Sequence, residues 1–403
     1  MFSFKNLRLL VPAVAIVVLI LHLSYKIIPH NPIANKAIST SFIENNDDSS
    51  LEEEPYKDDL LELTNSTLGF SKLIYLNVPS RYDLDDTMTM QSVISGIRPE
   101  RFEGVTTDDV TKLNPNNDGS RVIDPKGFAP AANRYLTMGP GGLACFRSHA
   151  NIWRLMIKNN WKTLLVLEGD AAWDVNIRRI MPHFSRGLEQ LMHKLGKIDN
   201  DTHVSRNDPY LSDHWDFINL GGCYANPKRK ELSVQYYDPY APEGTEKSPL
   251  MIHGMTIEKQ RRLVRYQTEE ACTGAYAITR QGAHKLLLRS MVDMGNPVDL
   301  VIRGLVASGA LEDYSVFPIL FNQGSYRKDL GPQSKGSETG DPNKNKQLSE
   351  ANIPWDDIHK TMNIWRYGIP GLSRFKKGML LNLQDYIFTK TEPMLDTDLG
   401  GKE

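Results

Sequence analysis

Two carboxylates one residue apart, Glu168 and Asp170, directly follow an apolar run at 163–167. A continuous apolar run of this length is typical of a strand buried inside a parallel sheet. Ligands of such sheets collect at the carboxyl ends of the strands. Paired carboxylates there can hold a hard cation such as Mg²⁺ or Mn²⁺, which typically bridges to substrate phosphates. The same residues could instead form a polar turn that merely ends the strand, with Gly169 supplying the bend.

The segments around these carboxylates alternate between strand-like and helix-like patterns. Short β-rich apolar runs predict strands at 72–78, 101–105, 163–167, 216–220, 271–279 and 314–321. Apolar residues at helical spacing predict helices after Asp85 and at 143–159, 177–195, 282–291 and 299–308. Strands separated by helices favour an α/β fold with a central sheet of mostly parallel strands.

Three of these segments carry more detailed expectations. Asp85 and Asp86 could cap the first helix. Spacing of i, i+3, i+4 and i+7 predicts its core face as Met90, Val93, Ile94 and Ile97. Pro182 is expected to interrupt the helix at 177–195. Residues 224–262 carry many charges and little periodicity, which predicts a surface excursion.

Composition excludes several classes of protein. The 403 residues carry 47 Lys and Arg against 49 Asp and Glu, a net charge of −2, so we expect no nucleic-acid partner bound through general positive charge. A hydrophobic content of 40% excludes wholesale disorder. Three cysteines cannot form a disulfide framework, although Cys223 and Cys272 flank predicted strands and could pair in an oxidising compartment.

The N-terminal region predicts a membrane anchor. Residues 9–25 form the one long apolar run of the chain, and about 17 residues is the lower limit for a helix that spans a bilayer. Two basic residues precede the run, which places a short tail at 1–8 in the cytoplasm. No small-residue cleavage site follows, so an uncleaved signal anchor at 9–28 is favoured over a cleaved signal peptide.

A flexible stem is predicted between the anchor and the folded region. Residues 29–70 contain a strongly acidic stretch that cannot bury enough apolar area to fold. Asn65 and Asn200 each begin an N-glycosylation sequon, and these matter only if this part of the chain faces the lumen. The expected topology is therefore a single-pass type II membrane protein with a lumenal folded domain.

Six segments together resemble glycosyltransferase family 25, which includes bacterial lipopolysaccharide glycosyltransferases and animal collagen galactosyltransferases. They occur in the family's order and cover about 72–322. The segments are IYLNVPSRYD (74–83), SGIRPERFEGV (95–105), GGLACFRSHANIW (141–153), LLVLEGDAAW (164–173), TGAYAITRQGAHKLL (273–287) and NPVD (296–299). The resemblance implies a GT-A-like nucleotide-sugar-binding domain at 71–323, followed by a partly irregular C-terminal extension at 324–403.

The resemblance also implies a metal site. Glu168 and Asp170 stand where the family has an acidic Glu-Asp-Asp cluster and would hold Mn²⁺ or Mg²⁺, with Asp170 counted among the catalytic residues. Gly169 replaces the usual middle Asp, which removes one carboxylate. Leu84 is a second departure, because relatives often carry a basic residue there.

Family positions suggest donor-binding roles for three further residues. Arg81 and Asp83 match a turn close to the nucleotide, where a guanidinium suits phosphate and a carboxylate suits ribose or base. A solvated turn would explain the same pair. His149 matches the family's Ser-His pair, and either a buried structural histidine or a hydrogen-bond donor to substrate fits its place on an apolar stripe.

Two later segments supply the remaining candidates. Gly274 and Tyr276 are expected on a strand near the donor sugar, although packing would also account for both. Asp299 follows Pro297 at a helix start, so capping alone would explain it. Its family position suggests the catalytic base, because members look inverting and need a carboxylate on the acceptor side.

The function implied is transfer of a hexose from a UDP-sugar, galactose first and glucose second, to a glycan or glycoprotein acceptor. The expected location is the Golgi or endoplasmic reticulum membrane, with the catalytic domain lumenal. One alternative is a catalytically silent relative that binds a glycan or protein, because the middle carboxylate is missing. Another, a membrane-tethered phosphate-ester hydrolase, is disfavoured by the lack of a nearby nucleophile or His cluster.

Overall fold

The structure is a computed structural model that describes residue 63 and residues 65–111, 122–123, 135–136, 140–223, 232–292, 294–326, 365–367 and 375–388. All of them belong to a unit that runs from Asp58 to Glu403. The predicted tail, the signal anchor at 9–28 and most of the stem lie outside the described residues. Within the described ranges, no helix is both long enough and apolar enough to cross a membrane.

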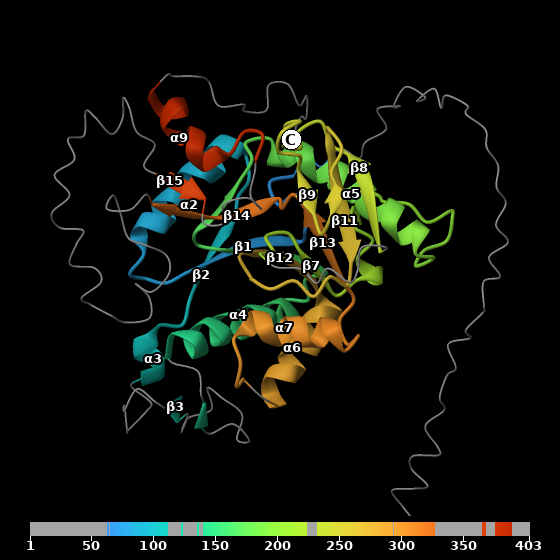
Figure 1. The fold of residues 1–403 in the computed structure, drawn as a ribbon. Coiled ribbons are helices and arrows are strands. Elements are labelled where there is room, and N and C mark those ends of the chain that lie inside the picture. Colours follow the sequence, from blue (N-terminus) through green and yellow to red (C-terminus); the bar gives the residue numbers. More distant parts are fainter. Residues whose placement is uncertain are drawn as a thin grey trace, which may run out of the picture. The chain divides into compact units, whose positions relative to one another are not determined.

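An eight-stranded mixed sheet forms the centre of the fold (Figure 1). Its order is β2 (Glu100–Glu103), β1 (Lys72–Asn77), β5 (Thr163–Glu168), β12 (Ala275–Thr279), β7 (Phe217–Asn219), β13 (Asp313–Phe317), β11 (Arg261–Tyr266) and β8 (Ser233–Tyr237). Six strands run in one direction, and β12 and β11 run against them. The predicted α/β class with a mostly parallel sheet is confirmed, and the arrangement is GT-A-like.

Helices cover both faces of this sheet (Figure 1). One layer contains α4 (Pro140–Lys158), α6 (Arg280–Val292) and α7 (Val298–Ala307), with the short α3 (Thr107–Thr111) beside α4. The other contains α2 (Tyr82–Ser95), α5 (Ile177–Lys194) and α9 (Met379–Phe388). Each layer buries its own hydrophobic core against the sheet.

Strand β5 shows why the apolar run at 163–167 is continuous. Leu165 and Leu167 point into one core, whereas Leu164 and Val166 point into the other. All four side chains are fully buried. Each buried leucine or valine contributes roughly 1.5–3 kcal/mol relative to an exposed one, so β5 is held firmly from both faces.

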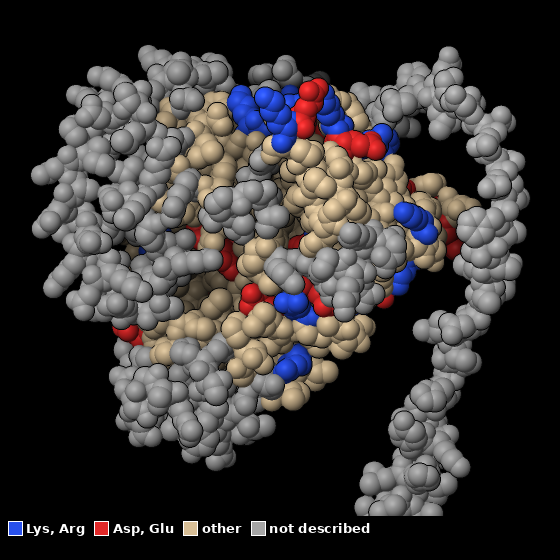
Figure 2. Space-filling model, in the orientation of Figure 1, with Lys and Arg blue, Asp and Glu red and all other residues tan. Residues whose placement is uncertain are grey.

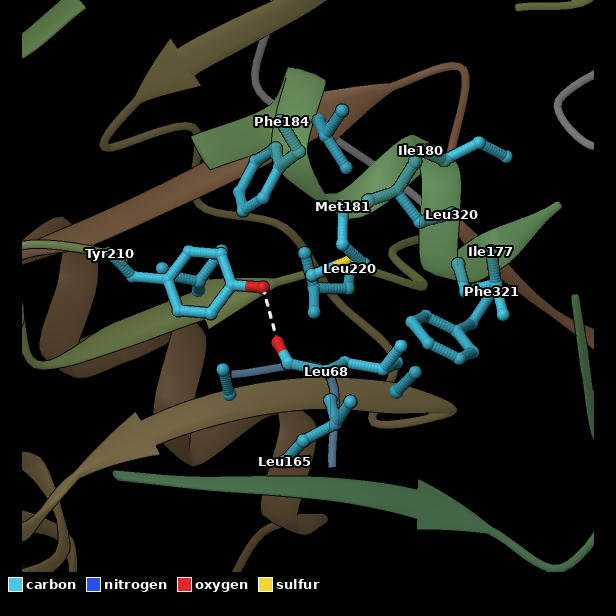
Figure 3. Close-up of a cluster of buried hydrophobic side chains, with 14 of the residues drawn as sticks. Leu68, Leu165, Ile177, Ile180, Met181, Phe184, Tyr210, Leu220, Leu320 and Phe321 are labelled. Atoms are coloured by element: carbon cyan, nitrogen blue, oxygen red, sulfur yellow. Dashed lines mark hydrogen bonds between the residues drawn. The ribbon is translucent and has the colours of Figure 1, made fainter. Parts of the chain in front are cut away.

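The first of these cores is the larger one and is drawn in Figure 3. Met181 and Phe184 of α5 pack there with Leu220, which follows β7. The Tyr210 hydroxyl donates a hydrogen bond of 2.5 Å to the backbone oxygen of Leu68, so its one polar group is satisfied inside the core (Figure 3). This bond connects the segment before β1 to the loop after α5.

The predicted core face of the first helix is only partly correct: Ile97 is buried in the larger core just after α2, and Ile94 packs against that core. Val93 is 62% exposed, and Met90 and Ile94 are only half-buried. The buried face instead carries polar side chains that form hydrogen bonds: Gln91 donates to the Ala171 backbone oxygen, and Ser95 accepts from Trp173 Nε1. Apolar spacing therefore misplaced most of the face, because the buried side of α2 mixes Leu84 and Met88 with polar residues such as Gln91 and Ser95.

The predicted cap of α2 is wrong. The helix begins at Tyr82, and Arg81 is its N-cap without a side-chain hydrogen bond. Asp85 lies inside the first turn, where it accepts from Tyr75 and Asn77 of β1. These bonds tie the helix start to the strand in place of a cap.

Four other segments differ from the prediction. Helix α5 continues through Pro182. The supposed surface excursion at 224–262 contains β8 and the start of β11, which form one edge of the central sheet. The run at 314–321 divides into β13 and β14 (Phe321–Tyr326), with Pro318, which cannot donate a ladder hydrogen bond, between them. In the run at 271–279, only Ala275–Thr279 is strand.

A second, three-stranded sheet leads from the central sheet to the C-terminal region. Strand β14 lies between β6 (Ala171–Trp173) and β15 (Trp365–Tyr367). It spans the predicted boundary between 323 and 324, a boundary that stays a prediction. Asp174 accepts the Lys377 backbone N–H at 2.7 Å, so the segment before α9 is fastened beside β6.

The remaining regular elements are short. They are the hairpin β9 (Met251–Ile252) with β10 (Met255–Thr256), the pair β3 (Val122–Ile123) with β4 (Tyr135–Leu136), and a 3-10 turn at Ser212–His214. On the face shown in Figure 2, Lys and Arg side chains gather near the top with acidic side chains among them. Neighbouring charges there offset one another, as the net charge of −2 suggests.

A buried charged cluster lies where β11 and β13 pair. Arg265 forms a buried ion pair with Glu270. Asp313 is 1% exposed at the start of β13. Burial raises the pKa of Asp313 well above its usual range, the Glu270 carboxylate raises it further, and Arg265 opposes both. Two buried carboxylates thus lie near one guanidinium, which forms its ion pair with Glu270.

Replacing Asp313 with Asn should stabilise the protein at neutral pH. The raised pKa means that Asp313 favours folding below the ordinary carboxyl value of about 4, and that this contribution is lost as pH rises through the raised pKa. The gain from Asp313→Asn should therefore grow with pH to about 1–3 kcal/mol. Denaturant unfolding across this pH range measures it.

Glu270→Gln is the contrasting variant. It removes the partner of Arg265 and should destabilise the fold. An Asp313→Asn variant less stable than wild type at neutral pH would contradict the assignment.

Candidate active site

Glu168 ends β5, and the turn through Gly169 and Asp170 leads directly into β6. The backbone N–H of Glu168 donates to the Gly274 oxygen at 3.0 Å. Its side chain accepts a 2.6 Å hydrogen bond from the Thr273 hydroxyl at Oε1. The loop before β12 therefore orients the Glu168 carboxylate, and Gly274 takes part through its backbone.

A buried aromatic cluster faces Glu168 from α4 and β12. The Tyr276 hydroxyl accepts from Trp153 Nε1 at 3.1 Å and lies 2.9 Å from His149 Nδ1. Burial raises the pKa of Tyr276 far above its usual value, so the hydroxyl keeps its proton and can donate it to Nδ1. The other ring nitrogen, Nε2, is 3.8 Å from Glu168 Oε1.

His149 and Tyr276 are held in place by burial and by their contact with each other. Both side chains are fully buried, and Nε2 of His149 is a buried polar atom with no hydrogen bond in the described structure. A distance of 3.8 Å is too long for a hydrogen bond. His149 is thus held beside the Glu168 carboxylate, and Tyr276 acts by orienting His149.

Asp170 is held from the other side by β14. Gln323 donates to Oδ2 of Asp170 at 2.7 Å, and the Gly324 N–H donates to its backbone oxygen at 2.6 Å. Gln323 was not among the predicted site residues. No motif marks it, because its role comes from the pairing of β14 with β6.

Arg81 and Asp83 bind each other. The guanidinium donates to both carboxylate oxygens, at 2.8 Å and 2.9 Å, and Arg81 is only 6% exposed. Tyr326 lies beside the pair: burial raises its pKa most strongly, and a hydrogen bond with Asp83 raises it further. The turn after β1 is thus a buried, bidentate ion pair, unlike the solvated turn considered above.

The Arg81 turn and Asp170 line one pocket together with the C-terminal region. Tyr326 packs against Trp365 there, with ring centroids 4.4 Å apart. The side chains that line the pocket include Arg81, Thr87, Asp170, Tyr326, Trp365 and Leu380. The last three lie beyond 323, so the predicted extension forms one wall of the site. Only the scattered aromatic residues of the C-terminal sequence hinted at this.

Asp299 contacts the same loop as Glu168, but from α7 and not from β5. It lies in the first turn of α7, where Oδ2 accepts the Cys272 N–H at 3.3 Å and Oδ1 accepts the Leu300 N–H at 2.9 Å. Cys272 is bonded to Cys223 in a disulfide with Cα atoms 5.7 Å apart. The pairing that the sequence left open is thus present, and it anchors the loop between Glu168 and Asp299.

Most of the predicted site residues therefore form two groups near the carboxyl end of β5. Glu168 lies with His149, Tyr276 and the backbone of Gly274. Asp299 is bonded to Cys272, and Glu168 is bonded to the next residue of the chain, Thr273. Asp170 shares a pocket with Arg81, beside Asp83. The sequon residues Asn65 and Asn200 are exposed.

The side chains of Glu168 and Asp170 offer the type of ligand atom that Mg²⁺ or Mn²⁺ takes. Both offer hard oxygen ligands at a strand end, and each is fixed by a hydrogen bond, from Thr273 to Glu168 and from Gln323 to Asp170. Mg²⁺ is commonly held by one or two carboxylates plus substrate phosphates and water. Two protein carboxylates are therefore sufficient for such a site.

Comparison with known proteins assigns this architecture to a family. The model of glycosyltransferase family 25, described as an LPS biosynthesis protein, matches residues 85–302, which is more than half of the chain. The chain belongs to glycosyltransferase family 25. The predicted resemblance is confirmed, and the matched range contains Glu168, Asp170 and Asp299.

Named relatives of this family 25 member come from animals. The chain is 25% identical to procollagen galactosyltransferase 1-B of Xenopus laevis over 303 residues, which is 72% of the chain and 40% of that protein. It is 25% identical to procollagen galactosyltransferase 1 of Danio rerio over 62% of the chain and 34% of that protein. A glycosyltransferase 25 family member of Anopheles gambiae is 31% identical over 28% of the chain and 18% of that protein. The chain thus spans less than half the length of these relatives.

Gly169, the departure from the family's acidic cluster, is packed closely in this family 25 member. A Cβ at this position would lie 2.9 Å from Asn77 Oδ1 and 3.1 Å from the Leu76 backbone oxygen. Asn77 is itself held by hydrogen bonds from its amide to the Arg81 backbone oxygen and to Asp85. The turn therefore requires glycine for steric reasons.

Gly169→Ala should destabilise the protein by about 1–3 kcal/mol, because the added methyl group meets both Asn77 and the backbone of β1. Gly304→Ala is the matched control: Gly304 lies within α7, where a Cβ meets nothing within 4 Å. That change should be neutral or stabilising by about 0.5–1 kcal/mol. Chemical denaturation of both variants checks the difference, and equal stability of the two would refute the packing argument.

Proposed function

We propose that this family 25 member transfers a hexose from a UDP-sugar, with galactose the first candidate and glucose the second, to a glycan or glycoprotein acceptor. The observation that carries the proposal is the pair Glu168 and Asp170 at the carboxyl end of β5, each fixed by a hydrogen bond. The names of the galactosyltransferase relatives favour galactose as the donor sugar.

On this proposal the donor diphosphate lies at Glu168 and Asp170, which hold Mn²⁺ or Mg²⁺. When bound, the cation supplies Lewis-acid stabilisation of the leaving diphosphate. Arg81 lies on the wall of the Asp170 pocket, whose free volume of about 10 Å³ is too small for a phosphate group, so its guanidinium would act on the diphosphate only through its charge at a distance. Its ion pair with Asp83 fixes its direction.

On the acceptor side, Asp299 is the proposed base of an inverting reaction. The bond between the anomeric carbon and the diphosphate oxygen breaks, a bond from the acceptor oxygen to that carbon forms, and the acceptor proton moves to Asp299. Asp299 and Glu168 contact neighbouring residues of one disulfide-anchored loop. The proposed base and metal ligand therefore share one support.

The proposed location is the lumen of the Golgi or endoplasmic reticulum, with a type II signal anchor at 9–28. The disulfide between Cys223 and Cys272 supports an oxidising compartment. The exposed sequon residues Asn65 and Asn200 would be accessible to glycosylation there.

A second candidate is a silent family member that binds a sugar donor or glycan without turnover. The observation in its favour is Gly169, because the turn has no space for the middle carboxylate of the family's cluster. On this second proposal the protein keeps the binding pocket but does not catalyse sugar transfer.

Release of UDP from a panel of UDP-sugars tests the proposal without knowledge of the acceptor. The purified 403-residue chain should hydrolyse one donor slowly, and only with Mn²⁺ or Mg²⁺ present. Asp170→Asn should lower this rate by about a hundredfold or more, because the developing charge on the diphosphate loses its counterion. Asp213→Asn, at a side chain 79% exposed and outside the site, should change nothing.

Two outcomes of this assay separate the candidates. Donor binding by calorimetry with no release, even with glycan and glycoprotein acceptors, would indicate the silent binding protein. Neither binding nor release would reject both candidates.

Asp299→Asn should lower acceptor-dependent turnover by about 10²- to 10⁴-fold while UDP-sugar affinity stays nearly unchanged. An amide oxygen can still accept the Cys272 N–H, so the loop should keep its position. Steady-state kinetics and donor calorimetry on the same preparation measure the two quantities. Wild-type turnover in Asp299→Asn would exclude Asp299 as the base.

A further inference from the structure

A second cluster of metal-ligating side chains lies at the C-terminal end of α5. Glu189 and His193 are four residues apart on this helix and so share a face. His203, from the loop after α5, reaches the same place. One ligand atom from each of the three side chains lies within 4.8 Å of the others, and this is the one such group of three in the described part of the chain.

Hydrogen bonds already gather these three groups. The Oε1 atom of Glu189 lies 2.9 Å from His203 Nδ1 and accepts the Val204 N–H at 3.2 Å. The imidazole rings of His193 and His203 have centroids 5.9 Å apart. Glu189 is only 13% exposed, whereas the His203 side chain is 66% exposed. The Glu189 carboxylate is thus held in place, and the His203 imidazole is open to solvent. His193, of intermediate exposure, is the third residue of the group.

We propose that Glu189, His193 and His203 bind a divalent transition-metal ion, with Zn²⁺ as the first candidate. Two imidazole nitrogens and one carboxylate oxygen suit Zn²⁺ better than the all-oxygen preference of Mg²⁺ or Ca²⁺. Water would occupy the fourth position. None of the three residues lines the pocket at Asp170 or contacts Glu168, so this site is separate from the proposed catalytic metal.

The rearrangement needed is small. Tetrahedral ligands about 2.1 Å from Zn²⁺ lie roughly 3.3 Å apart, so the 2.9 Å contact between Glu189 and His203 must open slightly. The two histidines must approach each other. Rotation of the exposed His203 ring provides both movements without a change in α5.

The effect expected of the metal is structural. It would join the end of α5 to the loop that carries the sequon residue Asn200 and Val204, which packs against the larger core. α5 itself contributes several fully buried residues to that core. A bound ion would therefore hold the loop after α5 in place where Val204 packs against the larger core.

Metal titration of the purified 403-residue chain tests the site. Zn²⁺ alone, measured by competition with a chromogenic chelator, should bind with one more equivalent in wild type than in His193→Ala/His203→Ala. Single substitution of His203 by Ala should weaken this equivalent by about tenfold or more. Co²⁺ should give a visible spectrum of tetrahedral type in wild type that the double variant lacks.

The matched control is His284→Ala, because His284 is also exposed on a helix and bonds only the Arg280 backbone oxygen in the described structure. It should bind Zn²⁺ as wild type does. Because binding to the folded state raises its stability, Zn²⁺ should also raise Tm more in wild type and His284→Ala than in the double variant. Glu189→Gln provides a second test if the double variant folds poorly. Equal Zn²⁺ stoichiometry and equal Co²⁺ spectra in wild type and these variants would overturn the proposal.

Discussion

The burial of β5 from both faces is the constraint on which the rest of the structure depends. Leu164 to Leu167 alternate between two separate cores, so the strand cannot slide by one residue without exchanging every contact. Its direction and end point are fixed as a result. Glu168 is the first residue of the strand that is not fully enclosed, and a charged group can emerge there without a large desolvation cost.

The site around Glu168 is assembled by long-range contacts that converge on this end point. The loop before β12 is fastened by the disulfide from Cys272 to Cys223 and offers Thr273 to Glu168. Strand β14 approaches from the other side and offers Gln323 to Asp170. Two carboxylates that are neighbours in sequence are thus oriented by segments about 100 and 150 residues further along the chain.

The sequence predicted six of the eight strands of the central sheet and the carboxylate turn, because these depend on local apolar patterns. It failed where packing is polar or non-local. The buried face of α2 carries Gln91 and Ser95, which apolar periodicity cannot detect. β8 and the start of β11 were assigned to a surface excursion at 224–262, because charged residues there were taken as exposed. Arg262 is in fact fully buried in an ion pair with Asp238. The roles of Gln323 and Trp365 arise only from the pairing of β14 with β6 and β15.

The replacement of the family's middle carboxylate by Gly169 is connected to the rest of the turn. Asn77 fills the space that a side chain at 169 would need, and its amide holds the Arg81 backbone at the start of α2. A carboxylate could enter at 169 only if Asn77 moved, and that movement would disturb the buried ion pair of Arg81 with Asp83. With Gly169, the turn lacks one potential carboxylate ligand, but the ends of β1 and β5 can pack closely against each other. That close packing keeps Arg81 and Asp170 in the lining of one pocket.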